Sequence, residues 1–240
     1  MDPDQYLAVI AREGAATSAA AAGVGLDADL PSCPDWDVAD LIAHTGRVHR
    51  WVTEIVTTRA TERVSRVGIL APTTDDLVPW FDEGVRDLVE TLRATDPAEP
   101  VWSWSSEQTV GFWRRRMAVE TTIHRWDAES ATGDPGPIDA DLAADAIDEF
   151  LDVYLPSEEA PLPPGGGSIH LHRTDGDGEW VLTLEADAVR IDRGHGHADV
   201  AVRGSAEELL LLLWRRITPD RVEVLGERSV LDRFLSWMEL

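Results

Sequence analysis

Lysine is absent from this chain of 240 residues, and cysteine occurs only once. All 21 basic residues are therefore arginine, which excludes a catalytic lysine that forms a Schiff base. Cys33 has no second cysteine with which to form an internal disulfide, as expected of a protein in a reducing compartment. Because the neighbouring sequence offers this thiol no charged partner, we interpret Cys33 as a structural residue of a proline-rich loop.

Long apolar runs and a basic amino terminus are also missing. No stretch approaches the roughly 18 uncharged apolar residues that a membrane-spanning helix needs. The first six residues, MDPDQY, have neither the positive charge nor the apolar run of a secretion signal. We therefore expect a soluble, cytoplasmic protein without a membrane partner.

Positive charge is scarce. The 45 acidic residues outnumber the arginines and give a formal net charge of -24, so binding to nucleic acid is disfavoured. Hydrophobic residues make up 43% of the chain and ten residues are tryptophan, which is typical of a folded protein rather than a disordered one.

Helical periodicity dominates the first two thirds of the sequence. Apolar residues recur at helical spacing in five segments, and a long loop over residues 96–111 separates the third from the fourth. The expected helices cover residues 4–23, from Asp35 or Asp37 to 58, 74–95, from Trp113 to about 133, and 138–154. Such a set of helices predicts a bundle over residues 1–155, in which a metal site would lie between facing helices.

The period changes after a segment rich in proline and glycine, residues 156–167, which we interpret as a linker. Alternating strands are expected over residues 168–173, 179–186, 189–193, 198–203 and 222–225, with helices over 205–217 and 227–238. The overall class is therefore α+β, with a small α+β domain over residues 168–240 that completes a ligand cleft with the bundle.

Glu120 and His124 interrupt an apolar row of the fourth predicted helix. The row contains Trp113, Met117, Glu120, His124, Asp127 and Ala131. A buried carboxylate needs a compensating charge, and a divalent metal supplies one that also binds imidazole. The alternative is that Glu120 only pairs with His124 or with a nearby arginine and fixes helix packing.

A third ligand would favour the metal, and the second predicted helix offers two histidines. His44 lies on the row with Leu41, Val48 and Trp51, whereas His49 lies on the neighbouring apolar row. Periodicity does not choose between them, and either one alone is more typical of a core histidine than of a ligand. Either one together with Glu120 and His124 would make the donor set of a zinc site with an open position.

Two segments resemble a known family: PSCPDWDVADLIAH, residues 31–44, and VETTIHRWDAE, residues 119–129. They are similar to the mycothiol-dependent maleylpyruvate isomerase family, whose first domain is a DinB-like four-helix bundle and whose second is a small α/β domain. The resemblance implies a divalent metal, usually zinc, bound by His44, Glu120 and His124. It also implies mycothiol as cofactor, whose thiol a metal deprotonates near neutral pH.

In the reaction that names this family, the thiolate adds to the double bond of maleylpyruvate, the bond rotates, and elimination gives fumarylpyruvate. An anionic substrate of this kind needs a cation. The resemblance implies a catalytic arginine at the end of the apolar helix of the second domain, and we expect Arg216 in this role, with Arg215 as the alternative. Either arginine is equally expected as a simple C-terminal cap of that helix.

Three alternatives remain open at this stage. A mycothiol S-transferase would join the thiol permanently to a small electrophile, and a non-catalytic protein would use the metal only to hold a ligand. A second metal site, at His170 and His172 of one strand with His195 and His197 near a turn, is compatible with the sequence but not favoured by it. The run Arg114-Arg115-Arg116 is expected on a solvated face or in surface ion pairs.

Overall fold

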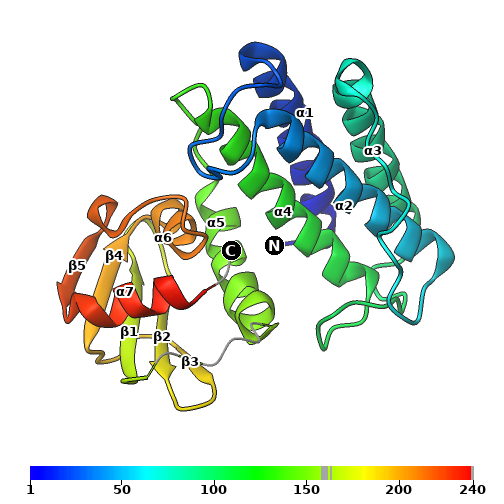
Figure 1. Cartoon of the computed structure of the whole chain (residues 1–240). Helices are drawn as coiled ribbons and strands as arrows, with labels where there is room; N and C mark the ends of the chain where they lie inside the picture. The colour runs from blue at the N-terminus through cyan, green and yellow to red at the C-terminus, as the bar shows by residue number, and fades with distance from the viewer. Residues whose placement is uncertain (158–161, 163, 239–240) are drawn as a thin grey trace. The chain divides into compact units, whose positions relative to one another are not determined.

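Four long helices build the first of two units into which the chain divides, Met1–Gly136. The computed structural model describes residues 1–157, 162 and 164–238. Figure 1 shows the four helices, α1 (Pro3–Val24), α2 (Val38–Thr58), α3 (Thr74–Ala94) and α4 (Val110–Ser130). The first two begin at capping boxes of Asp2 and Asp37, where an aspartate side-chain oxygen accepts a hydrogen bond from one backbone N–H of the first turn.

The helices of this unit pack through their apolar rows. α1 contacts α3 and α4, while α2 contacts α3 and α4. The apolar rows predicted for α2 are confirmed, because Leu41, Ile42 and Ile55 are fully buried. Phe81 and Leu88 of α3 are fully buried as well. None of the described helices is long and apolar enough to cross a membrane.

The contact between α2 and α3 depends on a glycine. A Cβ atom on Gly46 would lie 2.3 Å from Cζ3 of Trp80, so only glycine allows the indole to reach the backbone of α2. The guanidinium of Arg50, one turn further along α2, lies 4.0 Å from the centre of the same ring. These contacts fix α2 beside α3 and so set the direction of its remaining faces.

A five-stranded sheet forms the centre of the second unit, Pro137–Leu240. Its order is β3 (Val189–Arg193), β2 (Glu179–Leu184), β1 (Gly167–Arg173), β4 (Val200–Gly204) and β5 (Glu223–Gly226). β1 and β4 are parallel, and the other neighbouring pairs are antiparallel. Both α6 (Ala206–Leu213) and α7 (Arg228–Trp237) contact β1 and β4, which confirms the predicted α+β class.

The helix α5 (Ala140–Glu149) and the π-helical turn that continues it, Phe150–Tyr154, also belong to the second unit. The expected boundary at residue 155 therefore differs from the observed one. The reason is side-chain packing: α5 contacts α6, and the Asp148 carboxylate accepts hydrogen bonds from Trp180 and Arg193. Of the expected linker over residues 156–167, residues 158–161 and 163 lie outside the described residues.

One buried ion pair between α1 and α4 gives a stability prediction. Nε of Arg125 lies 2.7 Å from Oε2 of Glu13, and both side chains are buried. Replacing Arg125 by Met leaves a buried carboxylate without its main partner, so we expect the free energy of unfolding to fall by about 3 kcal/mol in urea titrations.

Arg12 provides the matched control, because it also contacts Glu13 but its side chain is 58% exposed. Arg12→Met is expected to cost less than about 1 kcal/mol. Equal losses in the two variants would contradict this account of the pair.

Candidate metal centre

The carboxylate of Glu120 faces two imidazoles from two helices. Its Oε1 atom lies 3.5 Å from Nε2 of His44 on α2 and 3.4 Å from Nε2 of His124 on α4. Ligand atoms of a tetrahedral zinc ion are about 3.3 Å apart, which follows from bond lengths of about 2.0 Å. Both distances to the carboxylate oxygen are therefore close to what one such ion requires, and one potential ligand atom of each of the three residues lies within 4.8 Å of the other two.

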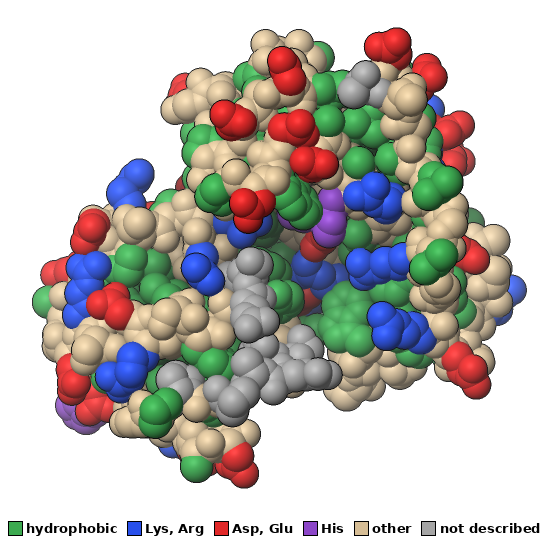
Figure 2. Space-filling view, in the orientation of Figure 1, with side chains coloured by type: hydrophobic (Ala, Val, Ile, Leu, Met, Phe, Trp, Pro, Cys, Tyr) green, Lys and Arg blue, Asp and Glu red, His purple; other side chains and the backbone are tan. Residues whose placement is uncertain are grey.

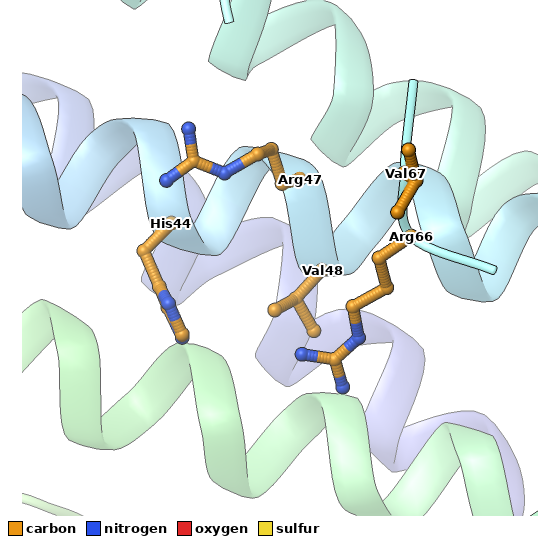
Figure 3. A pocket seen from close by; sticks show the side chains of 5 residues that line it. All are labelled: His44, Arg47, Val48, Arg66 and Val67. Atoms are coloured by element: carbon orange, nitrogen blue, oxygen red, sulfur yellow. The ribbon is translucent and has the colours of Figure 1, made fainter. Parts of the chain in front are cut away.

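His44 reaches this position from the neighbouring helix. Figure 3 shows its imidazole extending from α2 towards α4, and the two imidazole ring centres lie 5.2 Å apart at an angle of 74°. The indole of Trp36, from the loop before α2, lies 4.9 Å from the His44 ring on another side. The residues that the sequence predicted as a metal set therefore converge, although the metal itself stays a prediction.

His49 lies elsewhere in the same unit. It is fully buried, its ring packs on Phe81, and its Nε2 lies 3.0 Å from Oγ1 of Thr121. Since that hydroxyl donates to the carbonyl of Met117, the His49 Nε2–H must be the donor to Thr121. Burial lowers the pKa of His49 to about 3, because it outweighs the opposing effect of the Glu120 charge, so His49 is a neutral core histidine.

A buried aspartate orients the second imidazole. Oδ2 of Asp127, whose side chain is fully buried, lies 3.1 Å from Nδ1 of His124. A hydrogen bond from Nδ1–H to this carboxylate leaves Nε2 directed at Glu120, which is the arrangement that commonly supports a metal-bound histidine. The sequence placed Asp127 on the same helical row, so its spacing of three residues from His124 was the signal for this role.

Arg116 holds the other oxygen of Glu120. Its guanidinium contacts Oε2, so the expected pairing with an arginine occurs together with the cluster and not instead of it. Burial opposes ionisation, but Arg116 and then His124 and His44 keep the pKa of Glu120 well below its ordinary value. Glu120 is therefore an ionised carboxylate with one oxygen left for a ligand.

The arginine run on α4 differs from its expected surface position. Arg114 and Arg116 are both buried. Arg114 donates to the backbone carbonyls of Leu92 and Thr95 and to Asp4. The burial of these arginines could not be predicted from the sequence pattern. Consecutive arginines on a helix point in different directions, and only the packing of α1, α3 and α4 decides which of them are buried.

Two further arginines lie beside His44. A pocket of about 260 Å³ is lined by His44, Arg47, Val48, Arg66 and Val67 (Figure 3). The guanidinium of Arg66 lies 4.0 Å from the centre of the Trp51 ring, which holds it against α2. Figure 2 shows histidine and arginine side chains together on this face of the helical unit.

Neither Arg47 nor Arg66 was predicted from the sequence as a site residue. Arg47 follows His44 by three residues and so lies one turn along α2, which was a usable signal. Arg66 belongs to the loop between α2 and α3, where no periodicity indicates a direction. Both guanidiniums give the pocket a positive charge within a strongly acidic protein.

Arg215 and Arg216 follow the end of helix α6 in the second unit. The helix stops at Leu213, earlier than expected, because Arg215 adopts a left-handed conformation with φ of 56°. The N–H groups of Arg215 and Arg216 then bond back to the carbonyls of Leu212 and Leu211. The side chain of Arg216 donates to the carbonyl of Trp214, and that of Arg215 donates to the carbonyl of Met238, so the catalytic role of Arg216 remains a prediction.

Cys33 is not part of the centre. It is half-buried in the loop before α2, and its backbone N–H bonds to the carbonyl of Leu30. Two groups of three or more potential metal ligands occur among the described residues, and Cys33 belongs to neither. A thiol that binds a metal held by Glu120 would therefore have to come from another molecule.

The fold and site define a four-helix unit with a candidate metal centre, followed by a small α+β unit. Two family models match the chain: the mycothiol maleylpyruvate isomerase N-terminal domain over residues 7–129, and the MDMPI C-terminal domain over residues 141–233. The chain therefore belongs to the mycothiol maleylpyruvate isomerase family, as the resemblance predicted.

Solved structures agree on the fold. A crystal structure of the mycothiol-dependent maleylpyruvate isomerase matches with a TM-score of 0.68 and 15% identity over 95% of each chain. The structure of a histidine-to-alanine mutant of the mycothiol-dependent maleylpyruvate isomerase matches with a TM-score of 0.67, again at 15% identity and over 95% of each chain. No curated protein sequence matches the chain.

In metal-free protein, the pKa values of the two buried histidines of this unit, His49 and His124, are expected to shift in opposite directions. Burial opposes the charged form of His124, but hydrogen bonds to Asp127 and Glu120 outweigh it and raise its pKa from 6.5 to about 9. His124 should therefore stabilise the fold fully below pH 6.5 and lose this contribution as the pH rises towards 9. His49, with its lowered pKa, should destabilise the fold only as the pH falls below 6.5.

NMR titration of the histidine ring nitrogens in chelator-treated protein measures both values. Because a bound metal must replace the proton of His124, metal affinity should also increase with pH up to about 9. A His124 pKa near 6.5 in the metal-free protein would contradict the electrostatic description of the centre.

Proposed function

We propose that this protein is a mycothiol-dependent isomerase of the maleylpyruvate isomerase type that uses a divalent metal, zinc, bound by His44, Glu120 and His124. The observation that carries the proposal is the convergence of both Nε2 atoms on Oε1 of Glu120, in a chain that two models of this family match. Two imidazoles and a carboxylate are a donor set of catalytic zinc, which keeps a further position for an exogenous ligand.

Two neighbouring side chains orient the proposed metal ligands in the absence of a metal. Arg116 fixes the orientation of the Glu120 carboxylate, and Asp127 fixes the ring of His124. When bound, the metal supplies a Lewis acid that lowers the pKa of a thiol and so favours the thiolate. A cofactor thiol is required for this chemistry because Cys33, the single thiol of the chain, lies outside the ligand set.

Anion recognition falls to arginine, since the chain has no lysine. Arg47 and Arg66 line the pocket beside His44 and suit the carboxylates of a small anionic substrate or of the thiol cofactor. We retain Arg216 as the catalytic arginine of the second unit, on the strength of the family resemblance. Chemistry that uses a free thiol requires a reducing compartment, so we assign the protein to the cytoplasm.

Metal content tests the ligand assignment. We expect His44→Ala to lose about one equivalent of zinc relative to wild type in elemental analysis of protein purified without chelators, because it removes one of three donors. His49→Ala is the matched control on the same helix and should keep that equivalent. Circular dichroism checks that both variants fold, and loss of metal only from the His49 variant would overturn the assignment.

Activity with mycothiol and maleylpyruvate tests the reaction. Zinc-loaded protein should form fumarylpyruvate while the total thiol concentration stays constant, because the thiol leaves again in the elimination step. Glu120→Gln should reduce turnover by at least about 100-fold, since it removes the anionic ligand. Consumption of thiol without isomerisation would instead identify an S-transferase, and neither reaction would indicate a non-catalytic binding protein.

A further inference from the structure

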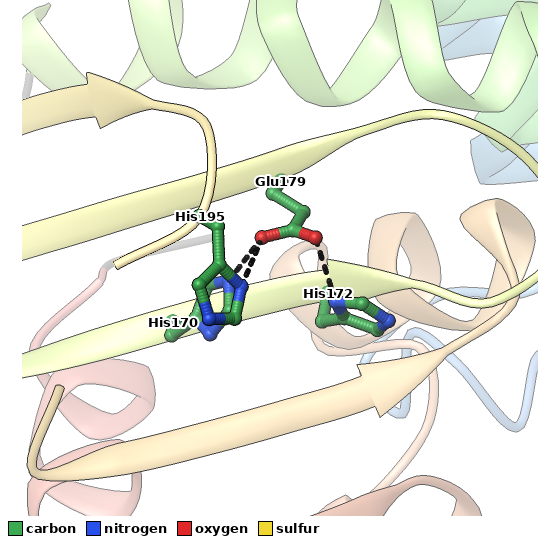
Figure 4. Close-up of side chains that lie close together, drawn as sticks. All are labelled: His170, His172, Glu179 and His195. Carbon is green, nitrogen blue, oxygen red and sulfur yellow. Dashed lines mark hydrogen bonds and ion pairs between the residues drawn. The ribbon is translucent and has the colours of Figure 1, made fainter. Parts of the chain in front are cut away.

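A second cluster of potential metal ligands lies on the sheet of the C-terminal unit. His170 and His172 are two residues apart on β1, so their side chains lie on the face opposite to Ile169 and Leu171. Glu179 begins β2 directly across from His172. His195 follows β3, and Figure 4 shows its ring and those of His170 and His172 grouped around the Glu179 carboxylate.

The four side chains meet at short distances. Oε2 of Glu179 lies 2.8 Å from Nδ1 of His195 and 3.0 Å from Nε2 of His170, while Oε1 lies 3.1 Å from Nδ1 of His172. The ring of His170 is nearly perpendicular to those of His195 and His172, with ring centres 5.2 and 5.8 Å apart. One potential ligand atom of each residue lies within 4.8 Å of the other three.

These separations are close to those around a metal ion. Ligand atoms of tetrahedral zinc lie about 3.3 Å apart, and imidazoles that share one zinc ion have ring centres about 5 Å apart. The His44 and His124 rings of the first centre are separated by a similar 5.2 Å. Three imidazoles and one carboxylate are borderline donors that suit zinc and other late first-row divalent metals.

The backbone around His195 is shaped to bring its ring over the sheet. Gly194 has φ of 104°, a conformation that favours glycine. A Cβ atom on Gly196 would lie 2.9 Å from Cγ2 of Val181, so this segment runs against β2 with no space for a side chain. His197, two residues further on, is exposed and takes no part in the cluster.

Hydrogen bonding to Glu179 alone does not require three histidines. A neutral imidazole carries a single N–H, and although a carboxylate can accept several hydrogen bonds, one donor for each oxygen is enough to pair it. His170 is buried here, although a histidine placed only to bond a carboxylate has no need of burial. The net charge of -24 further favours the binding of a cation at any set of competent donors.

We propose that His170, His172, Glu179 and His195 form a second metal-binding site, selective for zinc-like divalent ions and structural in role. The ion would fasten the glycine-flanked segment after β3 to β1 and β2. Because all four protein donors are available, the site has no position reserved for a substrate. The proposal is independent of the centre at Glu120, whose residues belong to the other unit.

Zinc binding in a His44→Ala background isolates this site. Metal-free His44→Ala protein is dialysed against zinc chloride, and zinc per chain is measured together with the melting temperature. We expect about one equivalent of zinc and a zinc-dependent rise in melting temperature. Adding His172→Ala or Glu179→Gln should abolish both effects, and cobalt added in place of zinc should lose its tetrahedral visible absorption.

His197→Ala in the same background is the matched control, because His197 lies on the same segment outside the cluster. It should retain the zinc and the rise in melting temperature. Equal zinc content in the His172, Glu179 and His197 variants overturns the proposal, whether all three retain the zinc or all three lose it. Circular dichroism without zinc verifies folding, and His172→Gln replaces His172→Ala if that variant is unfolded. The comparison between these variants tests the second site even if the proposed centre at Glu120 binds no metal.

Discussion

The half-buried, ionised carboxylate of Glu120 is the constraint on which the helical unit depends. An ionised carboxylate removed from water costs several kcal/mol unless charged or hydrogen-bonding partners replace the lost hydration. Here Arg116 contacts one oxygen, while the imidazoles of His44 and His124 face the other. The two oxygens of Glu120 therefore have different roles. Arg116 fixes one of them, and the other faces two imidazoles, which are ligands that metals prefer.

The packing of the helices serves this arrangement. Gly46 lets Trp80 approach α2 closely, which fixes the rotation of that helix and places His44, not His49, beside Glu120. On α4, the fully buried Asp127 holds the ring of His124 from behind. Arg47 and Arg66 then surround the accessible side of His44 with positive charge, in a protein whose charge is otherwise strongly negative.

Much of this architecture could be predicted from the sequence, because hydrophobic periodicity reports local structure directly. The four helices of the first unit and the order of strands and helices in the second unit were confirmed. Glu120 and His124 stood out because polar residues interrupted an apolar row. The choice between His44 and His49 was beyond periodicity, since both lie on inward rows and only the packing against α4 separates them.

Other features depend on tertiary contacts that no local pattern encodes. Helix α5 has the periodicity of a bundle helix, yet it joins the second unit because Asp148 bonds Trp180 and Arg193 of the sheet. Arg66 reaches the pocket from a loop, and Arg116 is covered by neighbouring helices. Among the histidines after β3, two glycines direct His195 to Glu179 and leave His197 exposed.

Anomalous diffraction at the zinc absorption edge, from crystals grown with zinc and mycothiol, tests the central claim most directly. A metal centre at Glu120 predicts a zinc peak within about 2.1 Å of the nitrogens of His44 and His124 and of a Glu120 oxygen, with a thiol sulfur at about 2.3 Å. A peak bound instead by His49, or the absence of any zinc between α2 and α4 under these conditions, would contradict it.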